Sequence, residues 1–324
     1  MIRKWSYSII VIILIAVYGT DAQHTSQSSL FMHDRYSFNP AFGGMESSLA
    51  VGLQYRSQWA GLPGNPETRT LNAHMPFYLW QGAIGFQLMN ETLGAENHTG
   101  FTISYNYIRE TDSGLWSFGA RGGLIQKSLD GTKLKAPDGN YEGGIIDHLD
   151  INLPNGVVSG ISPLVEAGAY FAGDYFEAGI SMTGYYPSGI QLGDDIQYSP
   201  NPSFQFFGEY FIETFEQVSI YPVVYIKSDL VQTQAELAIW AEWESILTAG
   251  LGYRGFGNKN LDALILAAGV RLSPKFYLHY GYDIGLSSLH SVHQGTHELM
   301  IRYNLGKMIG AGLPPRAIYN PRNL

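Results

Sequence analysis

The sequence predicts an all-β fold, a transmembrane β-barrel of about fourteen antiparallel strands with short turns at one end and longer loops at the other. Apolar and polar residues alternate with a period of two along segments of about ten residues, longer than is usual in soluble sheets. Aromatic residues crowd the segment ends, as at Phe77, Tyr78 and Trp80. A soluble β-sandwich would show the same local alternation, so segment length and aromatic position favour the barrel.

The predicted strands follow one another along the chain with inward and outward faces that alternate. In the first, Val51, Leu53 and Tyr55 share one face, and Gln54 and Arg56 share the other. The expected strands are residues 47–58, 67–76, 82–91, 97–109, 115–129, 163–172, 175–185, 202–211, 218–228, 232–242, 245–254, 261–271, 275–285 and 297–305.

The connectors favour the barrel independently. Outer-membrane barrels place both termini in the periplasm, with short periplasmic turns and longer outer loops. The connectors assigned to the periplasm are all short, whereas residues 130–162 and 186–201 fall into outer positions. The first of these is long enough to fold inward as a plug, so we expect no open pore.

Composition excludes several classes of protein. The chain has 324 residues, 38 glycines and 14% aromatic residues, which argues against disorder and against a helical bundle. Its net charge of −9 argues against a nucleic-acid-binding role.

The N-terminus resembles a secretory signal peptide, removed before Gln23. Arg3 and Lys4 precede an apolar run that is too short to span a bilayer. There is no cysteine, so we expect neither a lipoprotein anchor nor disulfides. We therefore divide the chain into a signal peptide (1–22), an N-terminal periplasmic or lumenal segment (23–46), a barrel (47–306) and a periplasmic tail (307–324), located in the outer membrane and in contact with its lipid.

Five short motifs carry a family resemblance. Residues 38–44 read FNPAFGG, residues 55–59 read YRSQW, and residues 66–68 read PET; GTHE at 295–298 and NPR at 320–322 follow. In this order they resemble the PorP/SprF family of Bacteroidota outer-membrane proteins, which belongs to the type IX secretion and gliding-motility machinery. The chain departs slightly at 42–44, where relatives more often have an aromatic residue, then alanine and glycine.

The resemblance implies a non-enzymatic barrel without a cofactor. Its partners would be a secreted adhesin-like protein, components of a periplasmic secretion ring, or both. Two other function classes remain open: a channel or shuttle for a small or hydrophobic ligand, and a soluble or surface-attached adhesin.

We expect partner contacts at both ends of the barrel sequence. Asn39 and Pro40 precede the first strand either as a simple lead-in or as a contact. Arg56 should face the lumen, in an ion pair or toward a partner, beside Gln58 and Trp59. The tail is extended by its prolines and basic, so it is either a free end or a docking arm. Its candidate residues are Pro314, Pro315, Arg316 and Arg322.

Other candidate sites give no catalytic or metal assignment. His290, His293 and His297 lack the spacing of a helical ligand pair, and the stretch 150–156 misses the EF-hand pattern. Glycines 119, 122 and 123 lack the βαβ context of a dinucleotide site. A basic series could line an anionic path or balance acidic groups in the lumen: Arg121, Lys127, Lys133 and Lys135.

Overall fold

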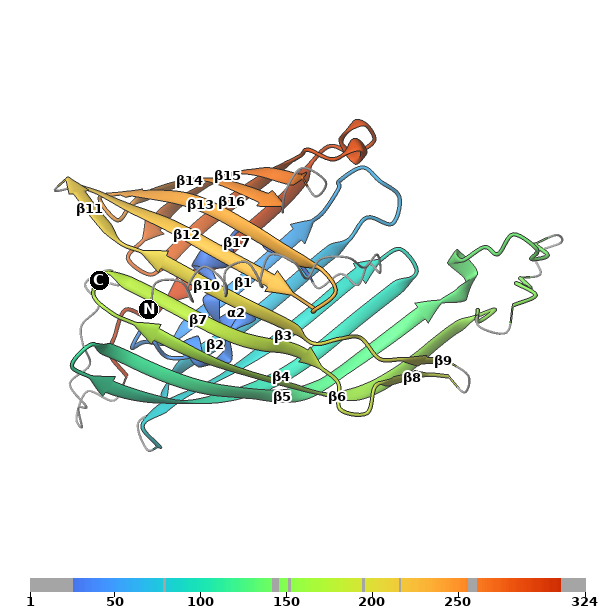
Figure 1. Cartoon of the computed structure of the whole chain (residues 1–324), viewed down its shortest axis with the longest axis horizontal. Helices are drawn as coiled ribbons and strands as arrows, with labels where there is room; N and C mark the ends of the chain where they lie inside the picture. Colours follow the sequence, from blue (N-terminus) through green and yellow to red (C-terminus); the bar gives the residue numbers. More distant parts are fainter. Residues whose placement is uncertain are drawn as a thin grey trace, which may run out of the picture.

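Fourteen antiparallel strands close into a barrel, as predicted (Figure 1). The computed structural model describes residues 26–77, 80–141, 146–150, 153–193, 196–215, 217–255 and 261–309. The predicted signal peptide and residues 310–324 of the tail lie outside the described residues. Barrel strands that are consecutive in the sequence are paired, and the ring closes between β1 and β17.

The strands agree closely with the predicted segments. They are β1 (Ala50–Ser57), β2 (Glu67–Phe77), β3 (Gly82–Leu93), β4 (Glu96–Thr111), β5 (Gly114–Asp130), β6 (Val157–Ala172), β7 (Phe176–Tyr185), β10 (Ser203–Tyr210), β12 (Val218–Ser228), β13 (Thr233–Trp243), β14 (Leu247–Gly255), β15 (Leu261–Ser273), β16 (Phe276–Gly285) and β17 (Thr296–Asn304). A short strand, β11 (Ile212–Phe215), continues β10 and pairs with the same neighbour, β12, so the two form one barrel strand.

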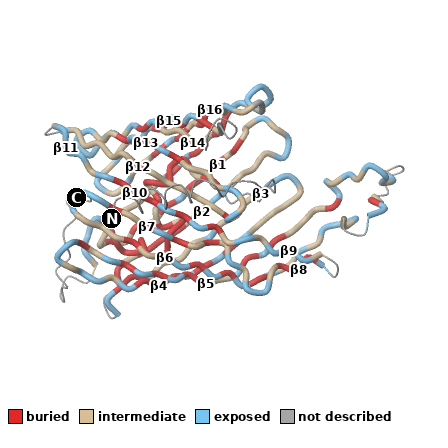
Figure 2. The backbone as a smooth tube through the Cα atoms, viewed as in Figure 1, coloured by how far each residue is buried: buried red, intermediate tan, exposed pale blue. Residues whose placement is uncertain are grey.

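The faces of the strands are reversed relative to a soluble protein. On β4, Phe101 is 49% exposed and Ile103 is 61% exposed, whereas Thr102 and Asn106 between and beyond them are buried. Buried positions gather inside the ring of strands in Figure 2. An apolar outer face suits hydrocarbon, and a polar inner face must find partners in the lumen.

Short helical turns lie inside the ring of strands, before β1 (Figure 1). They are η2 (Phe31–His33), α2 (Arg35–Phe38) and η3 (Pro40–Phe42). None of the helices in the described part of the chain is long and apolar enough to cross a membrane.

The two ends of the barrel differ in their connections. At one end, where β1 begins and β17 ends, the turns are short; we call this the short-turn end. At the opposite, long-loop end, the described parts of the connection after β5 (131–141, 146–150 and 153–156) and the hairpin of β8 (Ile190–Leu192) and β9 (Ile196–Tyr198) project beyond the barrel (Figure 1). Long connections alternate with short ones as predicted at most positions, but two connections at this end are also short: residues 94 and 95 between β3 and β4, and residues 229–232 between β12 and β13.

Three expectations about the long-loop end were wrong. Strand β6 begins at Val157 rather than at 163, because its ladder with β5 continues until Asp130 pairs with Val157. This extension carries the described residues of the connection between β5 and β6 away from the barrel, so they do not fold inward as a plug (Figure 1). The β8–β9 hairpin, expected as loop, packs on β5 and on the extension through a small apolar cluster of Ile125, Ile190 and Leu192, against which Val158 of the extension packs.

Candidate functional site in the barrel lumen

The lumen is occupied by the chain's own N-terminal segment, residues 26–49, which we call the lumenal segment. At the long-loop end, the Ser26 carbonyl accepts a hydrogen bond from Lys227 Nζ (3.2 Å). At the short-turn end, Glu46 forms an ion pair with Arg302 and accepts a hydrogen bond from Asn304 (2.7 Å). The lumenal segment therefore traverses the barrel from the long-loop end to the start of β1.

Five charged side chains from five strands hold the segment near the long-loop end. We call this group the latch: Arg56 (β1), Glu236 (β13), Arg254 (β14), Asp283 (β16) and Glu298 (β17). Arg56 reaches Asp283 (2.7 Å) and Glu298 (2.6 Å). Arg254 reaches Asp283 (2.9 Å) and Glu236 (2.7 Å). Each of the five is at most 3% exposed, so these charges meet inside the protein, where an unpaired ion would be costly.

The latch binds the backbone of the lumenal segment directly. Glu298 accepts hydrogen bonds from the backbone N–H groups of Ser29 (2.7 Å) and Leu30 (3.1 Å). The Ser29 hydroxyl donates to Asp283 (2.7 Å) and accepts from Arg254 (2.6 Å). Hydrogen bonds to charged groups are stronger than neutral ones, so the segment is fixed in position at this point.

Two further arginines tie the middle of the lumenal segment to the opposite wall. Arg35, within the segment, forms ion pairs with Glu177 on β7 and Glu209 (2.8 Å) on β10. Arg121, on β5, pairs with Glu166 (2.9 Å) and donates to the backbone carbonyls of residues 36 and 37. The segment is therefore held by charge from both sides of the lumen.

A row of glycines in the wall accepts the Asn39–Pro40 motif. The Asn39 amide donates to the carbonyls of Ala169 (3.1 Å) and Ile180 (3.2 Å), and its oxygen caps η3 at the N–H of residue 41 (2.9 Å). A Cβ atom on Gly168 would lie 2.1 Å from Asn39 Oδ1, and one on Gly119 would lie 2.6 Å from the backbone nitrogen of residue 41. These two glycines pair across β5 and β6, so together they form a notch that only the absence of side chains leaves open.

Aromatic side chains fill the space around the middle of the segment. Phe31 stacks on Tyr225 with ring centroids 4.7 Å apart, and Phe38 lies 5.9 Å from Phe207. Phe42 meets Tyr170 edge to face at 5.2 Å. This buried cluster blocks the lumen between its two ends.

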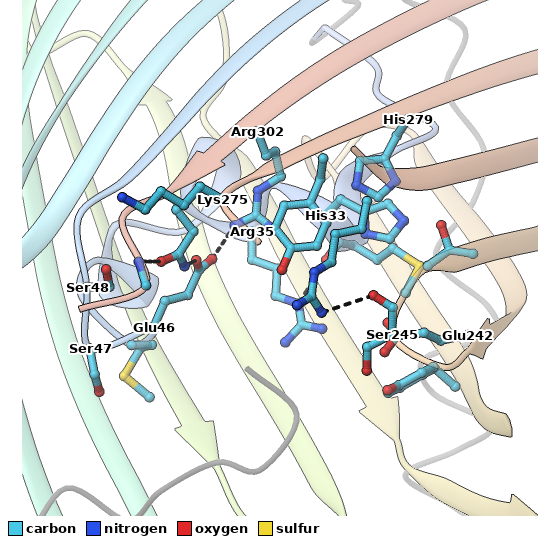
Figure 3. Close-up of a pocket in the computed structure, with 18 of the residues that line it drawn as sticks. His33, Arg35, Glu46, Ser47, Ser48, Glu242, Ser245, Lys275, His279 and Arg302 are labelled. Carbon is cyan, nitrogen blue, oxygen red and sulfur yellow. Dashed lines mark hydrogen bonds and ion pairs between the residues drawn. The ribbon is translucent and has the colours of Figure 1, made fainter. Parts of the chain in front are cut away.

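Among the described residues, a cavity lies on each side of this aromatic cluster. The larger, about 590 Å³, lies at the short-turn end and is lined by His33, Glu46, Lys275, His279 and Arg302, among others (Figure 3). The smaller, about 200 Å³, lies at the long-loop end around Gln27, Lys227 and neighbouring residues. The two share no lining residue, because residues 31–38 of the lumenal segment separate them.

At the rim of the larger cavity, Glu46 carries its charge in spite of burial. Burial alone would raise the pKa of this carboxyl, but the Arg302 guanidinium outweighs it, and the pKa lies below its ordinary value. Figure 3 shows Glu46 and Lys275 on one side of the cavity and Glu242 on the other.

The structure places the predicted site residues in three different settings. Asn39 and Pro40 are buried in the lumen, and Arg56 faces the lumen in ion pairs, as its position on β1 predicted. Gln58 is buried at the end of β1, and Trp59 follows with a positive φ of 53°. Pro314, Pro315, Arg316 and Arg322 lie outside the described residues. A contact between any of these residues and a partner stays a prediction.

The basic series balances acidic groups at three of its four positions. Arg121 pairs with Glu166, Lys127 with Glu96 (2.9 Å) and Lys133 with Asp130 (3.7 Å). Lys135 instead lies over the ring of Tyr141, 5.8 Å from its centroid.

The residues set aside as metal ligands have other contacts. His293 Nδ1 accepts from the backbone of Gly295 (2.8 Å), and His297 Nδ1 meets the Tyr280 hydroxyl (2.6 Å). Asn155 holds the backbone N–H of His148 (3.1 Å). Within the described ranges, no group of three or more histidine, aspartate or glutamate side chains could hold a metal ion.

Most of the latch was missed by sequence reasoning. Arg254, Glu236, Asp283 and Glu298 all occupy inward-facing positions, so the alternation marks each as a lumen residue. What it does not show is that they come together, because their contact depends on the stagger of five strands.

Comparisons with known proteins support this architecture. A family model described as "Type IX secretion system membrane protein PorP/SprF" matches residues 20–303. No curated protein matches the chain significantly. Among solved structures, the toluene transporter TbuX of Ralstonia pickettii is similar, with a TM-score of 0.52 and 13% identity over 89% of this chain and 96% of that one. The toluene transporter TodX of Pseudomonas putida gives a TM-score of 0.48 at 10% identity, over 89% of this chain and 96% of that one.

Proposed function

The chain belongs to the PorP/SprF family of type IX secretion system membrane proteins, and we propose that it is an outer-membrane barrel that supports the export or surface attachment of a secreted protein partner. The family is one of secretion-system membrane proteins rather than of enzymes. The observation that carries the proposal is the lumenal segment. Because latch and aromatic cluster close the lumen between two separate cavities, the barrel suits a scaffold that holds a partner better than it suits an open channel.

We assign the partner to one of two classes, a secreted adhesin-like protein or a component of a periplasmic secretion ring. Under the orientation rule for outer-membrane barrels, the short-turn end faces the periplasm. The described chain ends at this face, where the N–H of Ile309 donates to the carbonyl of Ser47 (3.3 Å). The tail that continues from there has Pro314, Pro315, Arg316 and Arg322, which suits an extended basic arm.

The test is a deletion of the gene, complemented by the full-length chain or by a chain that ends at residue 309. Surface proteomics before and after deletion should show the loss of at least one secreted protein, restored by the full-length chain. The truncated chain should insert normally, by heat-modifiability on gels, but recover less of the partner in a pull-down. Unchanged surface proteins after deletion would contradict the proposal. Full recovery of the partner by the truncated chain would show that the tail is not part of the contact with the partner.

A second candidate is a channel or shuttle for a small or hydrophobic ligand. The two cavities favour it, since a ligand could pass between them if residues 31–38 moved. The likeness to TbuX bears on the fold alone at 13% identity. Uptake of radiolabelled toluene by cells with and without the gene separates the two candidates, because only a channel predicts a difference.

A further inference from the structure

The cavity at the short-turn end has cations at its mouth that are not in ion pairs, unlike the arginines deeper in the lumen. Deep in the barrel, each arginine of the latch and its surroundings meets a carboxylate within 3 Å. At the mouth, Arg271, Lys275 and Lys307 line the cavity without an ion pair to any described residue. Arg271 instead donates to the carbonyl of Ser245 (3.3 Å). A carboxylate, Glu242, lies on the same wall, but the three cations outnumber it. The mouth is therefore basic, although the net charge of the chain is −9.

The wall of the same cavity also carries polar atoms without hydrogen-bond partners. Trp240 Nε1, Thr248 Oγ1, His279 Nδ1 and His33 Nε2 are buried and unpaired among the described residues. Such groups are uncommon, because a buried donor or acceptor without a partner is destabilising. Ser48 Oγ is a fifth such atom beside this cavity. The cavity at the long-loop end also has buried atoms without a hydrogen-bond partner, among them Gln87 Oε1 and Glu236 Oε1, so the cations at the mouth are what distinguish the short-turn cavity.

These polar groups converge. A Cβ atom built on Gly269 would lie 2.2 Å from His279 Nδ1 and 2.4 Å from Thr248 Oγ1, so both atoms surround one point that the glycine leaves empty. The His33 ring stacks on His279 with centroids 3.8 Å apart and meets Trp240 edge to face at 4.6 Å. A tryptophan N–H can only donate, so the group that pairs with it must be an acceptor.

We propose that this cavity binds a carboxylate-bearing peptide segment of the partner protein, which enters from the short-turn end. The carboxylate meets Lys275 and Lys307 at the mouth, and acceptors further along the segment reach the unpaired groups on the wall after small side-chain rotations. At about 590 Å³ the cavity is large enough for a few residues of peptide. The chain's own tail is a poor occupant, because Arg316 and Arg322 would meet a mouth of the same charge. The proposal rests on the proposed function only in that it takes the peptide segment to come from a partner protein.

Purified barrel in detergent tests it by fluorescence anisotropy. The probe is a labelled pool of random hexapeptides with free C-terminal carboxylates, and the comparison is the same pool amidated. A third pool, amidated but with one fixed aspartate, separates a side-chain carboxylate from a terminal one. We expect at least one carboxylate pool to bind at least fivefold more tightly than the amidated pool, and to weaken as salt is raised.

Two variants locate the site. The double substitution Lys275→Gln and Lys307→Gln should weaken binding at least fivefold, whereas Lys133→Gln and Lys135→Gln at the long-loop end should not. Trp240→Phe removes one unpaired donor, so it should weaken binding while leaving the barrel as stable as before or more stable. Trp116→Phe on the outer face is its control.

Three results would overturn the proposal. The first is equal binding of the acid and amide pools. The second is loss of stability in Trp240→Phe without any loss of binding. The third is binding that appears only after removal of residues 310–324, which would make the tail the occupant. Since this assay needs no secretion, peptide binding without a secretion defect would count against the proposed function alone.

Discussion

The two ends of the lumen treat polar groups in opposite ways. At the long-loop end, two arginines and three carboxylates of the latch meet one another and the backbone of the lumenal segment within hydrogen-bonding distance. At the short-turn end, Arg271, Lys275 and Lys307 line the cavity without an ion pair to any described residue, and buried histidine, tryptophan and threonine atoms are left without hydrogen-bond partners. The charges of the latch are therefore paired within the chain, whereas three cations at the other end are not.

We infer from this difference that the long-loop end anchors the lumenal segment and that the short-turn end recognises a partner. A network of paired charges holds the lumenal segment, although Arg56 Nε and Glu236 Oε1 within it have no hydrogen-bond partner among the described residues. An unsatisfied wall is less stable but available for binding. The predictions below test each side of this contrast.

The largest effect is expected from breaking the latch with Arg254→Leu. This change leaves Glu236 without its cation and Asp283 with Arg56 alone, and loss of one partner from a buried pair costs about 3–5 kcal/mol. Urea unfolding of the barrel in detergent, followed by tryptophan fluorescence, measures the loss. Arg69→Leu is the matched control, because its pair with Glu67 is exposed and should contribute less than about 1 kcal/mol. Equal stability of the two variants would mean that the latch does not hold the fold.

A smaller effect is expected at the glycine notch. Gly119→Ala places a methyl group 2.6 Å from the backbone of residue 41, so the lumenal segment must move, at a cost of about 1–3 kcal/mol. Gly122→Ala on the same strand is the control, because its Cβ would lie 4.0 Å from the nearest atom, the carbonyl oxygen of Leu164. Limited proteolysis should cut residues 26–49 faster in the first variant than in the second. If both variants resist protease equally, the notch does not seat the segment.

The barrel could be predicted from the sequence, and most of its interior could not. Strand alternation and connector length depend on neighbouring residues, so all fourteen strands were found within a few residues except the start of β6. There, Ser159, Gly160 and Ser162 weaken the apolar signal. That Arg56 faces the lumen followed from its alternation with Tyr55, but its partners Asp283 and Glu298 are more than 200 residues away, and only the closure of β1 on β17 brings Glu298 beside it.

The segment that closes the lumen could not be predicted from the sequence either. The longest connection, 131–156, was the obvious candidate, because length alone suggested that it could reach the lumen. The true plug precedes the first strand and is identified by its contacts: Asn39 in the glycine notch, and Ser29 in the latch. Glycines spread over β5 to β7 and a motif before β1 have no sequence relation that would link them.

The smallest effect concerns Glu46 at the short-turn end and depends on pH. The folded-state pKa of Glu46 lies below its ordinary value of 4.5, so its charge contributes stability above that value, and this contribution is lost as pH falls through the folded pKa. Glu46→Gln should therefore cost about 1 kcal/mol at pH 7 and nothing well below the folded pKa, measured by urea unfolding at each pH. A cost that is constant across the range would show that the charge does not matter.

The central claim is that the chain's own lumenal segment closes the barrel, and ion conductance across planar bilayers tests it most directly. The purified full-length protein should insert without stable conductance steps. A variant that lacks residues 26–38 loses the latch contacts and the aromatic block together, and should give stable steps. Stable, large conductance from the full-length protein would contradict the claim.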